Sequence, residues 1–255
     1  MKNKIFWLIL AVMLCFIDLY SQQGTAFGVK FGPSAGFQKW GSRDSELLLR
    51  YHADMYVETY GVDSPYALFA QVGFHKRGGA LRLRSASFQA FNSNDIITVP
   101  TRSYPYEFNN LALSVGAKQR FVGRNNTAFY YMLGVRGEYT VSTNLEDYHP
   151  EGDPLQLFNL IHPFPGSNVR KINYGVIAGG GIDFMFSELV GGMIELSISP
   201  DLSQQYFSPA FPYTQYINGS QRESVIPERK INNVSIELSL GIRLLRIVEY
   251  IDQVY

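Results

Sequence analysis

The stretch VSIELSLGIRL, residues 234–244, decides the fold of this 255-residue chain. Its large apolar residues fall at every second position, from Val234 to Leu244, and Glu237 and Arg243 are among the residues between them. Successive side chains of a β-strand point to opposite faces. The stretch therefore predicts a strand with one apolar face and one polar or small face.

Seven earlier windows alternate in the same way: 27–38, 47–58, 68–77, 111–120, 129–139, 174–186 and 194–199. No stretch of comparable length after the N-terminal apolar run has a sustained helical period, so the pattern predicts eight strands. The connections between them alternate in length. The second, fourth and sixth are short and span 61–65, 121–127 and 187–191, whereas the third, fifth and seventh are long and span 78–107, 142–171 and 203–230. The first connection, 40–46, is a short exception at the end that has the long loops.

Two kinds of eight-stranded barrel have such strands, a soluble lipocalin type and a transmembrane type. Short turns at one end and long loops at the other are typical of the transmembrane type, and only 17% of the residues are charged. Gly and Ser crowd the polar face, which suits a narrow interior. We therefore expect an all-β fold, an eight-stranded antiparallel transmembrane up-and-down β-barrel with three long extracellular loops. We expect strand 27–39 to close the barrel by pairing with strand 231–244.

The N-terminus has the pattern of an export signal. Lys2 and Lys4 precede thirteen apolar residues, 5–17, and Ser21 supplies a small residue for cleavage. A membrane anchor would need a longer apolar run. We expect a cleaved signal peptide at 1–21, an outer-membrane barrel at 22–245 with both ends in the periplasm, and a periplasmic tail at 246–255. The single cysteine, Cys15, lies inside the signal, which excludes disulfides and Cys-ligated metals in the mature chain.

Charges of both signs lie on the inward face by parity. The cations are Lys30, Arg50, Arg77, Lys118, Arg120, Arg136 and Arg243, and the anions are Asp54, Glu58, Glu138, Asp183, Glu195 and Glu237. Buried charges are costly unless paired, so near-equal numbers predict a network that satisfies itself. A ring of one sign, the mark of a selective pore, is absent. We expect a barrel that does not conduct, with a proton or ligand pathway as the alternative.

The sequence points to no catalytic, cofactor-binding or metal residue, and we expect no enzyme activity and no cofactor. His52 and His75 face inward by parity, where a hydrogen-bonded core role is the simpler interpretation. His149 and His162 lie in the fifth connection with Asp147 and other acids. An outer-membrane hydrolase, lipid-modifying or proteolytic, with a site at the extracellular rim is therefore one alternative function, and a small-solute transporter is another.

Large apolar residues crowd two of the long connections. The seventh holds Tyr206, Phe207, Phe211, Tyr213, Tyr216 and Ile217, and the fifth holds Leu155, Leu157, Phe158, Leu160, Ile161 and Phe164. These loops either cap the barrel mouth or bind a partner protein. The partners expected are other outer-membrane or periplasmic proteins and outer-membrane lipid. The zero net charge excludes nucleic acid.

Five short phrases are shared with a known family: FGVKFG from Phe27, LALSVGAK from Leu111, YYMLGVR from Tyr130, GGGIDF from Gly179 and IELSLGI from Ile236. They resemble the recurring strand phrases of the PorT-like outer-membrane β-barrel family of Bacteroidota. The family usually has a Pro shortly after a Glu where the fourth strand begins, and Asn109 to Leu113 lacks it. The resemblance implies an eight-stranded barrel that serves as an accessory or structural subunit of an outer-membrane complex, of type IX secretion or biogenesis machinery.

Overall fold

The structure is a computed structural model and describes residues 24–39, 45–59, 64–83, 85–89, 96–99, 101–123, 127–145, 166–217, 220–226 and 228–246. The expected signal peptide, the tail beyond Arg246, and His149 and His162 lie outside the described residues. No helix in the described part of the chain is long and apolar enough to cross a membrane.

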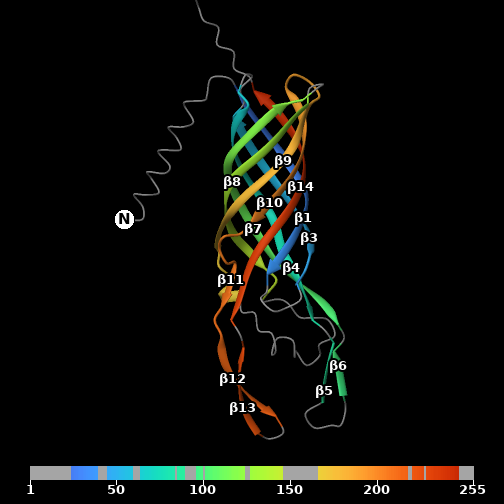
Figure 1. The fold of residues 1–255 in the computed structure, drawn as a ribbon, viewed down its shortest axis with the longest axis vertical. Coiled ribbons are helices and arrows are strands. Elements are labelled where there is room, and N and C mark those ends of the chain that lie inside the picture. Colours follow the sequence, from blue (N-terminus) through green and yellow to red (C-terminus); the bar gives the residue numbers. More distant parts are fainter. Residues whose placement is uncertain are drawn as a thin grey trace, which may run out of the picture.

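Eight long strands form the barrel (Figure 1). They are β1 (Thr25–Lys39), β3 (Leu48–Thr59), β4 (Tyr66–Leu83), β7 (Arg102–Val122), β8 (Thr127–Thr143), β9 (Ile172–Met185), β10 (Val190–Pro200) and β14 (Arg229–Arg246). Each pairs antiparallel with the next of these strands along the chain, and β14 pairs back with β1. The eight-stranded antiparallel barrel predicted from the alternation is confirmed.

The seam between β1 and β14 closes the barrel. Its register runs from Thr25 opposite Arg246 to Lys39 opposite Asn232, which confirms the expected pairing of the first and last strands. The backbones come close at Gly32, where a Cβ atom would lie 1.8 Å from the carbonyl oxygen of Leu238. Glycine at this position therefore permits the approach.

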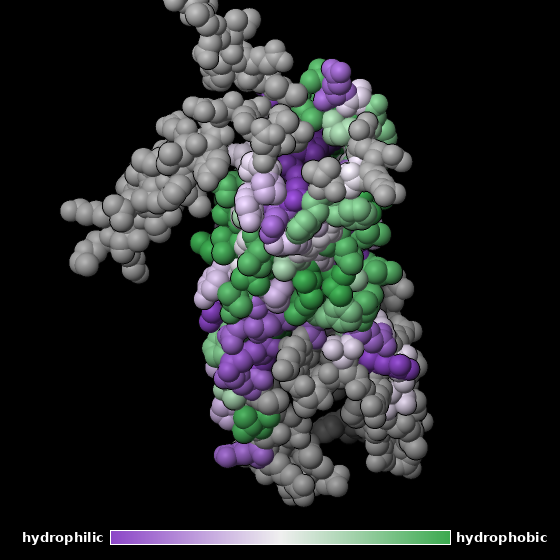
Figure 2. All heavy atoms as spheres, turned by 45° about the horizontal axis from the view of Figure 1, so that its top comes forward, coloured by the Kyte–Doolittle hydropathy of each residue, from purple (hydrophilic) through white to green (hydrophobic). Residues whose placement is uncertain are grey.

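The outer wall of the barrel is apolar. In β14, Ile236, Leu238 and Leu240 remain exposed, whereas Glu237 and Ser239 between them are buried. The same alternation in the other strands builds the hydrophobic belt around the barrel in Figure 2. Such a wall is unfavourable in water but matches hydrocarbon, so the belt is the surface that lipid covers.

At one end, the barrel extends beyond the belt, and here the expected loop 78–107 is wrong. β4 continues to Leu83 and β7 begins at Arg102, and these two residues still pair. In this extension the inner face is apolar and the outer face is polar. Tyr104 and Tyr106 point inward and are buried, while Ser103 is exposed. The sequence pattern assumed apolar residues on the outer face. It therefore did not predict these strand extensions, whose apolar residues face inward.

Smaller elements lie at the same end, which we call the loop end (Figure 1). β5 (Ala86–Gln89) pairs with β6 (Ile96–Val99), and β12 (Phe211–Ile217) pairs with β13 (Ser220–Ile226). β2 (Ser45–Glu46) pairs with β4, and β11 (Tyr206–Ser208) pairs with β14. A single 3-10 turn, η1, spans Gly166–Asn168.

The opposite end, the turn end, has short connections. The turn between β9 and β10 is closed by the N–H of Phe186, which donates to the carbonyl of Val190 at 2.9 Å. The N–H of Gly123 donates to the carbonyl of Thr127 at 2.8 Å between β7 and β8. The long and short connections therefore lie at opposite ends, as the sequence predicted.

Candidate functional site

Inward-facing charges line the interior of the barrel and form two networks of ion pairs, one around Glu58 and one around Glu138. The cations are Lys30, Arg77, Lys118, Arg120, Arg136 and Arg243, and the anions are Asp54, Glu58, Glu138, Asp183, Glu195, Asp201 and Glu237. Each side chain is more than nine-tenths buried and has a histidine or an oppositely charged neighbour within 4 Å. Because buried charges are costly unless paired, this pairing permits a polar interior inside an apolar wall.

Glu58 is the centre of the network near the turn end. Its carboxylate lies 2.5 Å from Arg120, 3.0 Å from Arg243 and 3.2 Å from Lys118. Arg243 and Arg120 also contact Asp183, at 3.0 and 3.4 Å. The five side chains come from β3, β7, β9 and β14, so this cluster ties separate parts of the barrel wall together.

Lys118, a member of this cluster, also lies among aromatic rings. Its ammonium group lies 4.5 Å from the ring centroid of Tyr130, and the rings of Tyr56 and Phe69 are 5.5 and 5.6 Å away. Glu195 is 3.6 Å from Lys118, accepts a hydrogen bond from the Tyr130 hydroxyl at 2.8 Å, and pairs with Lys30. Aromatic faces and carboxylates together surround this buried cation, and both interactions stabilise it.

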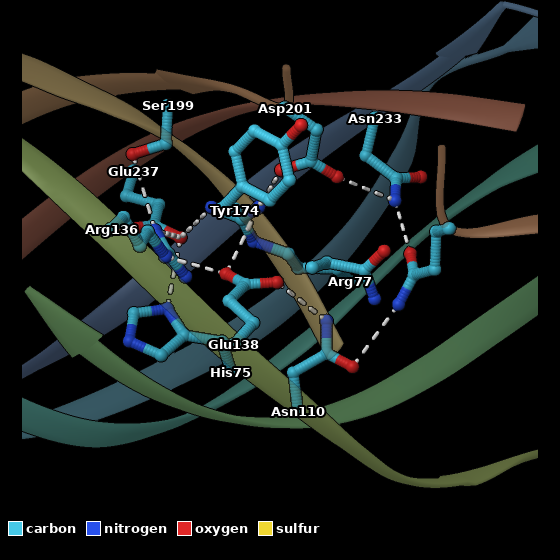
Figure 3. A network of polar contacts seen from close by, with 12 residues as sticks. His75, Arg77, Asn110, Arg136, Glu138, Tyr174, Ser199, Asp201, Asn233 and Glu237 are labelled. Carbon is cyan, nitrogen blue, oxygen red and sulfur yellow. Dashed lines mark hydrogen bonds and ion pairs between the residues drawn. The ribbon is translucent and has the colours of Figure 1, made fainter. Parts of the chain in front are cut away.

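Glu138 is the centre of a second cluster, nearer the loop end (Figure 3). Its carboxylate lies 2.5 Å from Arg136 and 3.1 Å from Arg77, and it accepts a hydrogen bond from Asn110 at 2.8 Å. Arg77 also contacts Asp201 at 3.0 Å. Each arginine therefore lies within reach of more than one acceptor.

His75 lies between two carboxylates. Its Nε2 is 2.7 Å from Asp54, and its Nδ1 is 3.0 Å from Glu237. His75 therefore bridges Asp54 in β3 and Glu237 in β14 through its two ring nitrogens. Gly73 leaves room for this contact, because a Cβ there would lie 2.1 Å from Asp54 Oδ1.

His52 stacks on His75, with ring centroids 5.4 Å apart, and its Nε2 is 2.8 Å from the hydroxyl of Ser239. Both histidines are therefore buried inside the barrel, as their parity predicted. They are packed into the charge network, and among the described residues no group of three or more His, Cys, Asp or Glu side chains is placed to hold a metal ion.

Amide side chains cover the charged network toward the loop end. Gln205 donates to Asn110 and Thr140, both at 3.1 Å. Asn233 donates to Asp201 at 3.1 Å and accepts from Gln38 at 2.9 Å. Uncharged donors and acceptors thus separate the ion pairs from the apolar cluster beyond them.

An apolar plug closes the interior at the loop end. It consists of Tyr104, Tyr106, Phe108, Leu145, Tyr206 and Ile231, with Val169 packed against it. Tyr206 and Ile231 have no exposed surface. Tyr206, in the seventh connection, therefore caps the barrel mouth. Of the two roles expected for this connection, capping the barrel and binding a partner protein, Tyr206 has the capping role.

Arg50 is the exception to the predicted inward set. It contacts Glu107, which also binds Lys76 at 2.6 Å. Lys76 and Glu107 are flanked in their strands by buried residues, so they lie on the outer wall. Arg50 keeps the inward phase of β3, between the exposed Leu49 and Tyr51, and is opposite the buried Ser34 of β1. Its half-buried side chain pairs with Glu107 instead of joining the interior networks.

Glu107 lies beyond the belt, because the outward apolar series ends at Phe74 in β4 and at Leu111 in β7. Partial burial acts to raise the pKa of Glu107, but hydrogen bonds and charge from Lys76 and Arg50 outweigh it and hold the pKa below its usual value. The lowered pKa favours the ionised carboxylate of Glu107, which accepts from Lys76 and Arg50.

Two members of the interior were missed from the sequence. Asp201 follows the end of β10, and Gln205 lies in a stretch expected to be loop. Both turn back into the mouth of the barrel, which no periodicity of two reveals. One sequence feature pointed to this segment. Tyr206, which follows Gln205, belongs to a group of large apolar residues that is unusual in a solvated loop.

Solved structures with a similar fold are outer-membrane barrels. OprG from Pseudomonas aeruginosa is 8% identical, with a TM-score of 0.44, and the match covers 88% of this chain and 97% of that chain. Neisserial surface protein A is 11% identical, with a TM-score of 0.39 and coverage of 86% and 97%. The outer-membrane protease OmpT from Escherichia coli is 8% identical, with a TM-score of 0.38 and coverage of 88% and 97%. Likenesses this distant do not carry a function from one protein to another.

A search of curated protein sequences finds no match. A family model described as "outer membrane protein beta-barrel domain" matches residues 20–203, most of the chain. This match agrees with the closed barrel, the apolar outer wall and the paired polar interior. The chain belongs to the outer membrane protein β-barrel domain family and is an outer-membrane β-barrel protein.

Proposed function

We propose that this barrel is a non-enzymatic, non-conducting subunit of an outer-membrane protein complex. The observation that carries the proposal is the filled interior. Ion pairs occupy it from Glu58 to Asp201, and the apolar plug around Tyr206 covers it at the loop end. Because these side chains contact one another, the interior supports a structural role better than transport or catalysis.

The open space in the wall supports the same view. A groove of about 440 Å³ lies against the outer wall, lined mainly by apolar residues such as Phe27, Met55, Val72 and Leu113. It faces the lipid belt, and Tyr56 and Gln71 are the lining residues with polar side-chain atoms. A site with a perturbed catalytic residue would be expected in a concave pocket with polar groups.

The contact surface of the proposed subunit is the loop end. The β12–β13 hairpin extends from the barrel there, and its sequence contains Phe211, Tyr213 and Tyr216. Aromatic side chains are frequent at the centres of protein interfaces. The resemblance to PorT-like barrels supports a complex of the type IX secretion or biogenesis kind.

We also propose that residues 1–21 are a cleaved export signal and that both ends of the mature chain face the periplasm. The apolar run 5–17 supports the signal. The short connections at the turn end support the orientation, because outer-membrane barrels have short turns on the periplasmic side.

The decisive experiment is a pull-down of the native protein in mild detergent, followed by mass spectrometry. One variant replaces residues 210–227 with a short Gly-Ser linker, which removes β12 and β13 but keeps Tyr206 in the plug. The matched control replaces 86–99 and removes the other hairpin. We expect a stoichiometric partner that is lost with the first deletion and kept with the control. A lone monomer in every preparation would contradict the proposal.

Two further measurements separate the alternatives. In planar bilayers the folded protein should give no stable conductance steps, and reproducible ion-selective steps would favour a transporter instead. Substituting His149 and His162 by Ala should leave the phenotype of a complemented deletion strain unchanged. A phenotype that depends on these histidines but survives removal of 210–227 would favour a hydrolase.

A further inference from the structure

A cluster of cations surrounds one aromatic side chain on the outside of the barrel at the loop end. Phe207, in β11, has the guanidinium of Arg170 and the ammonium of Lys230 each 5.8 Å from its ring centroid. Its neighbours Tyr206 and Ser208 are buried, so Phe207 faces outward. We call Arg170, Lys171, Phe207 and Lys230 the rim patch.

The barrel scaffold fixes the position of the rim patch. Phe207 and Lys230 are opposite each other in the β11–β14 register. The N–H of Arg170 donates to the carbonyl of Gln205 at 2.8 Å, which ties the start of β9 to the same segment. The patch therefore stands on paired backbone from β11 and β14.

The rim patch borders the apolar belt. Ile172, directly after Lys171, is 75% exposed, and Tyr174 and Leu202 nearby are also exposed. Side chains of this kind meet acyl chains, so the cations beside them are placed where the lipid headgroups begin. Figure 2 shows hydrophilic side chains directly below the hydrophobic belt on the face it displays.

The patch has an excess of positive charge. Lys230 pairs with Glu228, but no acid in the described part of the chain pairs with Arg170 or Lys171. Elsewhere on the described rim each of the cations Arg50, Lys76 and Arg82 has an acidic partner, because Arg50 and Lys76 share Glu107 and Arg82 pairs with Glu46. The chain as a whole has no net charge, so this local excess does not follow from its composition.

We propose that the rim patch binds the phosphate groups of lipid headgroups in the leaflet that surrounds the loop end. Arginine contacts phosphate through two parallel N–H groups, and lysine adds a mobile positive charge. Phe207 provides an aromatic anchor at the interface between belt and headgroups, where aromatic rings are favoured. The proposal goes beyond the role as a complex subunit and does not depend on it.

The test measures lipid retention by native mass spectrometry of the full-length mature protein, folded in neutral detergent. The probes are bisphosphorylated lipid A, dephosphorylated lipid A, phosphatidylglycerol and phosphatidylcholine. The variant is Arg170→Gln with Lys171→Gln. The matched control is Lys76→Gln with Arg82→Gln, which removes the same charge from another part of the rim.

The wild type should retain bisphosphorylated lipid A or phosphatidylglycerol over the uncharged or zwitterionic lipid. The double variant should lose about tenfold or more of this preference, because it removes two cations that attract the anionic headgroups. The control should lose less than about twofold, and added salt should weaken the wild-type preference. A stronger effect of lipid A than of phosphatidylglycerol would identify a phosphorylated glycolipid as the source.

Three results would overturn the proposal. The wild type could retain phosphorylated and dephosphorylated lipid A equally. The two double variants could lose retention equally, which would mean that only net charge matters. Inositol hexakisphosphate, a soluble polyanion, could bind the patch while none of the charged lipids is retained, which would point to a soluble ligand. Heat-modifiable gel mobility of each variant checks that it has folded, so a loss of retention is not confused with misfolding.

Discussion

The inner and outer walls of this barrel are built from alternate residues of the same strands, yet they have opposite chemistry. In β14, Glu237 is 2% exposed and ion-paired, whereas the adjacent Leu238 is 44% exposed. In a protein surrounded by water the arrangement would be reversed. The difference shows that burial alone does not say which residues are apolar, because the medium outside the wall decides it.

The two walls also differ in how specific their contacts are. Outside, any acyl chain can replace another against Leu238. Inside, Glu138 depends on Arg77 and Arg136 at defined distances. Stability should therefore be sensitive to single changes on the inner wall and tolerant of apolar changes on the outer wall.

The largest effect is expected from Glu237→Ala. This substitution leaves His75 and Arg136 without an acceptor that both now contact, and removing one member of a buried ion pair costs about 3–5 kcal/mol. The matched change on the outer wall is Ile236→Ala, one residue away. It should cost about 1–2 kcal/mol, because it removes apolar surface that folding transfers from water to lipid but leaves no buried charge unpaired.

Urea titration in lipid vesicles, followed by heat-modifiable gel mobility, gives the free energy of unfolding for both variants. Equal losses for Glu237→Ala and Ile236→Ala would contradict the distinction between the walls. An unaffected Glu237→Ala variant would mean that water, rather than the ion pairs, satisfies the interior.

A charge placed on the outer wall should have the next largest effect, and the effect should depend on depth. Leu240 lies in the middle of the exposed apolar series of β14, and Leu244 lies at its turn-end limit. Leu240→Arg should cost about 2–4 kcal/mol and Leu244→Arg about 0–1 kcal/mol in the same titration. Similar costs at both positions would place the lipid belt elsewhere along the barrel.

The sequence predicted the parts of the fold that depend on alternation. The eight strands and the seam between 27–39 and 231–244 follow from apolar residues at every second position. Alternation also predicted that thirteen charged residues face inward. The described structure buries twelve of them, all but Arg50. Alternation is a local property, and the lipid outside enforces it along each strand.

The rest depends on contacts that local periodicity does not encode. Arg50 has the inward phase of β3, but its side chain pairs with Glu107 at the rim, which periodicity does not predict. The strand extensions at 78–83 and 102–107 were missed because their inward residues include Tyr104 and Tyr106, which reverse the expected pattern. Asp201 and Gln205 reach the interior from a segment beyond the strand end. These features arise at the loop end, where lipid no longer constrains the outer face.

The smallest effect is expected at the rim. Glu107 there is more exposed than the charges of the inner wall and less exposed than the side chains of the outer wall. The side chain is 16% exposed and binds Arg50 and Lys76, so water weakens each contact. Glu107→Gln should therefore lower the free energy of unfolding by less than about 1 kcal/mol near neutral pH. This is well below the loss expected for Glu237→Ala.

The pH dependence of this small difference has a defined sign. Because folding lowers the pKa of Glu107, the carboxylate stabilises the folded state above the unfolded pKa, and that contribution is lost as the pH falls through the ordinary carboxyl range. The wild type should thus be more stable than Glu107→Gln at pH 7, and the two should converge as the pH falls below about 4. Subtracting the two urea titrations at each pH removes the shared contribution of the interior carboxylates. A difference that stays constant with pH would show that Glu107 acts through packing, and the rim would then resemble the outer wall more than the inner one.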